Sequence, residues 1–197
     1  MNLLAHFALA DGDPGWLLGA LLGDHVKGPL RGAWEARTEQ GIRLHRRIDA
    51  YIDHHAGRRA TLHAMPAPLR RYGGILLDIH DDYLLTRHWP RFHSGSLSAL
   101  NARVCGLLDA AQDELPASAR RHARAVTDHQ LLLAFADWTA VAGSVERVAL
   151  RLRQAGLGEA GTHWLNAQHD ALEQRFLAYY PDLITLAAEQ KHAFEVK

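Results

Sequence analysis

The chain has 197 residues, of which 48% are hydrophobic, and 22 basic residues balance 22 acidic ones. This length fits one domain with a sizeable core, and zero net charge argues against nucleic acid or membrane as a partner. No run approaches the roughly 18 to 20 apolar residues that span a bilayer, and the first residues lack the basic start of a signal peptide. The single cysteine, Cys105, excludes an internal disulfide. We therefore expect a cytoplasmic protein with one domain over residues 1–197.

Leu, Ala and Arg dominate the sequence, and the alternation typical of strands is scarce, which favours helix throughout. Gly and Pro residues mark the ends of the predicted helices. These helices cover residues 3–10, 14–25, 36–59, 66–88, 96–111, 116–133, 137–154, 162–179 and 181–194. No repeat, low-complexity segment or linker divides them. The predicted fold class is all-α, a single compact domain of about eight or nine helices.

The most informative segment runs from residue 41 to residue 55 and carries His45, Asp49 and Asp53 at intervals of four residues. On a helix these side chains share one face, about one turn apart. Apolar neighbours make that face half-buried, so the carboxylates would repel or desolvate one another without a compensating cation. Two interpretations stay open here. Either the three residues bind a divalent metal, or the aspartates form ordinary ion pairs with an arginine such as Arg46.

A second acidic pattern lies in the fourth predicted helix. Asp78 and Asp82 are four residues apart among strongly apolar neighbours, so both carboxylates are expected near the core. Buried carboxylates need a cation or several hydrogen bonds. Asp81 falls on another face and is expected to be solvated.

Two further polar features lie near the N-terminus. Asp24 stands at the end of the second predicted helix, followed by Lys27 and the chain breakers Gly28 and Pro29. Lys27 is a candidate contact for a phosphate. His6 interrupts the apolar first helix, where a lone histidine is either a hydrogen-bonded core residue or a ligand. The 14 histidines of the chain favour metal or acid–base chemistry.

These carboxylates and imidazoles, without thiolate ligands, suit Mn, Mg, Fe or Zn. A metal beside arginines is typical of phosphoester hydrolysis. The chain has no P-loop, GxGxxG or GxSxG motif, which disfavours nucleotide-dependent transfer and acyl hydrolysis. Nine arginines against four acids give residues 31–71 a local charge of +5. This predicts either a surface for a phosphate or an acidic partner, or an ordinary solvated helix surface.

At these residues the sequence resembles the acyl carrier protein phosphodiesterase family over nearly the whole chain. The resemblance rests on the opening Met-Asn-Leu-Leu-Ala-His and on residues 19–28, 41–53, 77–89 and 169–181. Its most specific blocks are His-Arg-Arg-Ile-Asp at 45–49 and Arg-His-Trp at 87–89. The resemblance implies an all-helical fold distantly similar to HD-domain phosphohydrolases. It also implies removal of the 4′-phosphopantetheine group from holo-acyl carrier protein, with Mn²⁺ or else Mg²⁺, Fe²⁺ or Zn²⁺.

The resemblance and the spacing together name candidate residues. Candidate metal ligands or their supports are His6, Asp24, His45, Asp49, Asp78 and Asp82. Candidate contacts to the phosphate or the carrier are Lys27, Arg46 and Arg47. Tyr83 stands where the family commonly has His and is a candidate weak proton donor, and Arg58 and Arg59 are expected to dock the acidic carrier. Two alternatives remain: an HD-like phosphohydrolase for a nucleotide or other small phosphoester, and a catalytically weak carrier-binding module.

Overall fold

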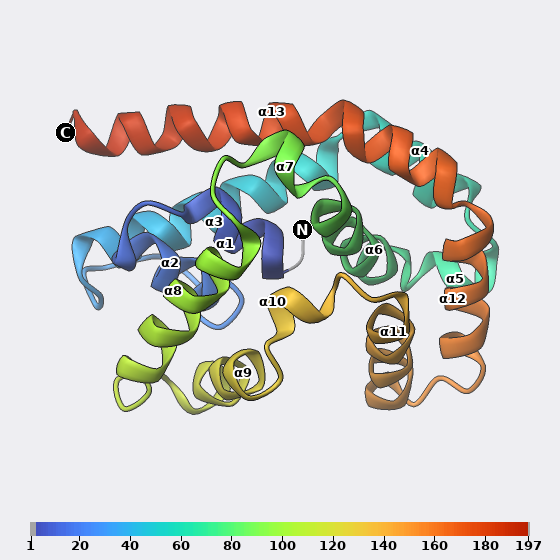
Figure 1. Ribbon diagram of the computed structural model, residues 1–197, viewed down its shortest axis with the longest axis horizontal. Helices are drawn as coiled ribbons and strands as arrows, with labels where there is room; N and C mark the ends of the chain where they lie inside the picture. Colours follow the sequence, from blue (N-terminus) through green and yellow to red (C-terminus); the bar gives the residue numbers. More distant parts are fainter. Residues whose placement is uncertain (1–2, 197) are drawn as a thin grey trace.

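A computed structural model describes residues 3–196 of the chain and shows helices and no strand within that range (Figure 1). The all-α fold class is therefore confirmed. The helices are α1 (Leu3–Ala10), α2 (Pro14–Leu22), α3 (Ala36–His54), α4 (Ala56–Ala64), α5 (Ala67–Arg70), α6 (Gly73–Arg87), α7 (Trp89–Phe92), α8 (Leu97–Ala110), α9 (Ala117–Asp128), α10 (Leu131–Ala134), α11 (Trp138–Leu152), α12 (Leu157–Ala167) and α13 (His169–Glu195). The first two residues of the predicted opening motif lie outside the described range, as does residue 197.

The structure divides the predicted helices more finely than the sequence did. The helix predicted over 36–59 ends at His54, because His55 adopts extended backbone angles (φ −64°, ψ 127°), and α4 starts directly after it. The helix predicted over 66–88 is two helices, α5 and α6, and the one predicted over 116–133 becomes α9 and α10. The break at His55 turns the chain, so that side chains of α4 meet α6 instead of continuing along the face of α3.

In the C-terminal part, the structure has a longer helix than the sequence predicted. A break was predicted at Pro181, yet α13 continues through this residue for 27 residues in all. Proline inside a helix costs about 3 kcal/mol through a lost hydrogen bond and a steric clash. Phe176, Tyr179, Tyr180 and Leu183 are all buried on either side of it. Their burial offsets that cost, because tertiary packing supplies most of a helix's stability in a protein.

Helices α1, α2 and α3 form the part of the fold that positions the candidate site. Asp13 caps α2 by accepting the backbone N–H groups of Gly15 and Trp16. A side chain at Gly19 would overlap Gly41 of α3, and one at Gly41 would overlap the backbone of Trp16. Glycine at both positions thus lets the two helix backbones touch, which holds the C-terminal end of α2 against α3.

Figure 1 shows α1, α2 and α3 on one side of the molecule and α5, α11 and α12 on the other. Helix α13 runs along one edge of the molecule and packs on α3, while α9 and α11 lie on the opposite side. One buried apolar cluster joins α1, α2, α3, α8 and α13, and a second joins α6, α11 and α12. Among residues 3–196, no helix is both long enough and apolar enough to cross a membrane.

Candidate metal centre

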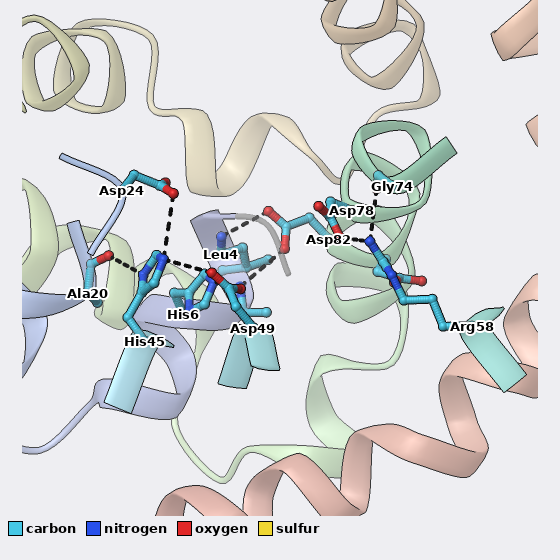
Figure 2. Close-up of polar contacts among 12 residues, drawn as sticks. Leu4, His6, Ala20, Asp24, His45, Asp49, Arg58, Gly74, Asp78 and Asp82 are labelled. Carbon is cyan, nitrogen blue, oxygen red and sulfur yellow. Dashed lines mark hydrogen bonds and ion pairs between the residues drawn. The ribbon is translucent and has the colours of Figure 1, made fainter. Parts of the chain in front are cut away.

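The centre is built on one turn of α3. His45 is 3% exposed, and its Nδ1 lies 2.8 Å from the carbonyl oxygen of Ala20 in α2. A carbonyl only accepts, so Nδ1 carries the hydrogen and Nε2 is the atom presented to the site. Nε2 lies 3.1 Å from Asp49 Oδ2 and 3.6 Å from Asp24 Oδ1 (Figure 2). An imidazole fixed by a backbone carbonyl on one nitrogen is the usual arrangement of a metal-binding histidine.

The close approach of His45 to α2 depends on Gly23. A Cβ atom at residue 23 would lie 2.6 Å from His45 Nδ1 and closer still to its ring carbons. Only glycine leaves room for the imidazole there. The same turn of chain ends α2 and leads directly to Asp24, so one local feature places both side chains.

His6 reaches the centre from α1. Its Nε2 lies 3.1 Å from Asp49 Oδ1, and its ring stacks on that of His45 with 3.7 Å between centroids. Helix α1 is fixed at its N-terminus by Asp82, whose two carboxylate oxygens accept the N–H groups of Leu4 (2.9 Å) and Ala5 (3.1 Å). Asp82 therefore acts on the centre by positioning the helix that carries His6.

The centre stabilises the charged forms of His45, Asp24 and Asp49 and the neutral form of His6. Burial opposes charge on His45, but hydrogen bonds with Asp24 and Asp49 outweigh it and raise the His45 pKa to about 9. The hydrogen bond with His45 lowers the pKa of Asp24 to about 2. Burial works against ionisation of Asp49, yet hydrogen bonds with both histidines hold its pKa well below the ordinary value. Burial, with charge on His45, lowers the pKa of His6 to about 4.

The donor set fits a divalent cation. One ligand atom from each of His6, His45 and Asp49 lies within 4.8 Å of the other two, and Asp24 adds a further oxygen at the open side. Two imidazoles with carboxylates suit Mn, Fe or Zn. A cation bound here would take the place of the proton that the two carboxylates now hold on His45. His6, His45 and Asp49, with Asp24 beside them, thus form a candidate metal-binding group, called the metal-binding group below, and the donor types leave the metal's identity open.

A cleft of about 660 Å³ opens beside the centre, with Asp24 and Asp78 in its wall. Its other walls come from α6, α9, α10 and α11. Near Asp24 the histidines His25 and His122 are joined by a contact of 3.1 Å between Nε2 and Nδ1. His25 and His122 are 97 residues apart, so no sequence spacing could have shown that they meet.

Comparison with known proteins shows the family of this chain. A family model described as acyl carrier protein phosphodiesterase matches residues 1–183. The chain belongs to this family. Relatives named acyl carrier protein phosphodiesterase from Escherichia coli O9:H4 (strain HS) and Escherichia coli (strain K12 / DH10B) are each 29% identical to it over 193 residues. The match covers 96% of this chain and 99% of each relative. No solved structure matches, so the likeness to HD-domain phosphohydrolases stays a prediction.

In this member of the acyl carrier protein phosphodiesterase family, the predicted site residues do not all lie together. His6, Asp24, His45 and Asp49 come together, whereas Asp53, the third residue of the predicted stack, is exposed. Asp53 lies in the last turn of α3, just before the break at His55, and its side chain is exposed there.

The predicted acidic pair on α6 is split. Asp82 is fully buried and burial raises its pKa to about 8, but it serves α1 as described above. Asp78 lies in the cleft wall, 2.6 Å from Arg58. The expectation that Asp81 is solvated is wrong: it is fully buried and paired with Arg175 at 2.7 Å and Arg58 at 3.6 Å.

The predicted basic contacts also differ from one another. Arg46 donates to the carbonyl oxygens of Val26 (2.7 Å) and Gly28 (2.9 Å), so it holds the segment that follows Asp24. Arg47 and Lys27 are exposed. The prediction that Arg58 docks a partner is wrong, because this side chain is 3% exposed and its guanidinium faces Asp78 and Asp81. Arg59 is exposed.

Tyr83 lies in another aromatic group, on a different face of α6 from Asp82. Its ring is 5.3 Å from Trp138 and 5.9 Å from both His80 and His169. The structure therefore gives this tyrosine a packing environment between α6, α11 and α13.

Proposed function

We propose that this chain hydrolyses the phosphodiester bond that joins 4′-phosphopantetheine to the serine of holo-acyl carrier protein. Water adds to phosphorus, the bond between phosphorus and the serine oxygen breaks, and that oxygen takes up a proton. The products are apo-carrier protein, with a free serine hydroxyl, and 4′-phosphopantetheine as a phosphomonoester. Family membership over residues 1–183 supports the reaction, and the metal-binding group beside an open cleft supports its place in the fold.

His6, His45 and Asp49 would hold the cation, and Asp24 would complete the set from the solvent side. Mn²⁺ is the ion we propose, because imidazole and carboxylate donors both suit it. A divalent ion supplies positive charge beside a phosphoryl group and eases the ionisation of water. Asp82 and the backbone carbonyl of Ala20 hold the two histidines in place. The cytoplasmic location expected from the sequence remains a prediction.

The test is incubation of the purified chain with holo-acyl carrier protein and Mn²⁺, followed by the intact mass of the carrier. We expect loss of the phosphopantetheine mass, and no loss after treatment with a chelator. A matched reaction of Asp49→Ala should be inactive, and Asp53→Ala, one turn further along α3 and exposed, should be active. An unchanged carrier mass with every divalent ion tried would refute the proposal. Hydrolysis of a nucleotide instead would favour the HD-like alternative.

A further inference from the structure

The cleft beside the metal-binding group has two kinds of wall. Ile75 and Ile79 of α6, Phe135, and Val148 of α11 provide apolar surface. At the metal end the lining is polar, with Asp24 exposed for 62% of its side chain. A volume of about 660 Å³ lies within the range of pockets that enclose small organic ligands.

Two arginines of α11, Arg147 and Arg151, also line this cleft. They stand one helical turn apart and are exposed. Within residues 3–196 no carboxylate pairs with either, and the hydrogen bond recorded for the Arg147 guanidinium goes to the Ser144 hydroxyl at 2.8 Å. A guanidinium carries five N–H donors and accepts nothing, so these side chains offer donors to whatever enters the cleft.

The wall therefore matches a ligand with three properties. It carries a phosphoryl group at one end, which would lie by Asp24 and the metal-binding group. It has apolar groups that can contact Val148 and Phe135. It also has several oxygen acceptors along its length that can accept hydrogen bonds from Arg147 and Arg151. The pantetheine arm has this composition, with two methyl groups, a hydroxyl and two amide carbonyls behind its phosphate.

We propose that this cleft receives the pantetheine arm of the substrate, with Val148 and Phe135 packing on its methyl groups and Arg147 and Arg151 donating to its carbonyl oxygens. The phosphodiester then lies at the metal end, and the carrier protein stays outside the cleft. This inference rests on the proposed function, since it places the prosthetic group of that substrate. The proposal gives α11 a role in substrate specificity, although this helix contributes none of the metal-binding residues.

The first experiment narrows the cleft with a larger side chain. Val148→Trp adds bulk at its wall, and Leu150→Trp is the control on the same helix, where the side chain is 68% exposed. Isothermal titration of the Mn²⁺-loaded proteins with free 4′-phosphopantetheine measures binding of the arm directly. We expect Val148→Trp to weaken binding about tenfold or more, or about 1.4 kcal/mol, and Leu150→Trp to match the wild type.

Two activities separate this proposal from the proposed function. Holo-carrier protein needs the cleft, whereas methyl p-nitrophenyl phosphate is a small diester that needs only the metal end. Val148→Trp should raise KM for the carrier by a larger factor than KM for the small diester, and Leu150→Trp should leave both unchanged. If the wild type cleaves neither diester, the proposed function fails. If it cleaves the carrier and Val148→Trp behaves as Leu150→Trp does, or if both activities fall together, the cleft is not the arm site.

Val148 is partly buried against the second apolar cluster, so Val148→Trp could disturb the fold. A second variant therefore tests the same cleft at exposed positions. Arg147→Ala combined with Arg151→Ala removes only exposed side chains. This double variant should weaken 4′-phosphopantetheine binding about tenfold. Arg124→Ala, an exposed arginine of α9 that donates to Gln112, is its control and should bind as the wild type does. Equal affinity of the double variant and the wild type would overturn the role of the arginines.

Discussion

Replacing Gly23 with alanine tests whether the metal-binding group depends on the contact between α2 and α3. The new methyl carbon would lie 2.6 Å from His45 Nδ1 and nearer to the ring carbons. Ordinary contacts between nonbonded heavy atoms are about 3.5 Å or longer, so the imidazole would have to move by about 1 Å. Residue 23 has right-handed helical angles (φ −53°, ψ −37°), which alanine accepts, so the backbone itself is not strained.

A shift of this size is large for a metal ligand, since ligand distances hold to within about 0.2 Å. It also lengthens the hydrogen bond from His45 to Ala20, which fixes the ring. Loss of such a supporting bond typically lowers metal affinity about 10- to 100-fold. We expect Gly23→Ala to lose Mn²⁺ affinity by that factor, as measured by isothermal titration. Its melting temperature should also rise less on addition of Mn²⁺, because a ligand stabilises a protein according to its affinity.

Gly106→Ala is the control for this substitution. Gly106 lies in α8, and no atom falls within 4 Å of a Cβ placed there. Alanine at that position should leave Mn²⁺ affinity unchanged and raise the melting temperature slightly, since glycine in a helix interior costs about 1 kcal/mol relative to alanine. If Gly23→Ala is folded and binds Mn²⁺ as tightly as Gly106→Ala does, the contact between Gly23 and His45 does not position the ligand.

Three further predictions concern the other buried polar groups. Asp49→Ala should lower Mn²⁺ affinity more than about 100-fold in isothermal titration, while Asp53→Ala leaves it unchanged; equal affinities would place the metal elsewhere. Arg58→Met removes one of the cationic groups that contact Asp78 and Asp81 and should destabilise the fold by about 3 kcal/mol in urea unfolding, whereas Arg59→Met should have little effect; equal midpoints would contradict this. Burial lowers the pKa of His80 from 6.5 to about 3, so this side chain is neutral in both states above pH 6.5, and between pH 6.5 and 3 only the unfolded state takes up the proton. The free energy of unfolding should therefore fall by up to about 1.4 kcal/mol for each pH unit as pH drops through that window. His80→Phe should flatten the profile of unfolding free energy against pH. His63→Phe, at an exposed position, should leave that profile unchanged.

Spacing within one helix was enough to predict two of the four residues that meet in the candidate metal-binding group. His45 and Asp49 are four residues apart on α3, and residues at that interval must share a face once the segment is helical. The same rule predicted Asp78 and Asp82 on one face of α6, but it gave no information about their partners. Those partners, Arg58 for Asp78 and the start of α1 for Asp82, come from other elements.

Two of the errors concern the position at which a helix ends. Arg58 was expected at the surface because it was read as part of a continuous helix, and the break at His55 redirects it into the protein. Pro181 was read as a break because the local cost of proline is known, while the buried aromatic residues on both sides of it act only in the folded state. At Pro181 tertiary packing outweighed a sound local signal, whereas at His55 the helix ended earlier than the sequence predicted.

The sequence by itself determined the all-helical class, the family resemblance and the pair on α3, because each depends on residue types or on spacing along one chain segment. Tertiary structure decided that His6 and Asp24 join that pair, that Asp82 holds α1, and that His25 meets His122 beside the cleft. These contacts link residues that are from 21 to 97 positions apart. Such distances are closed only by the packing of whole helices against one another, as where Gly19 lets α2 touch α3.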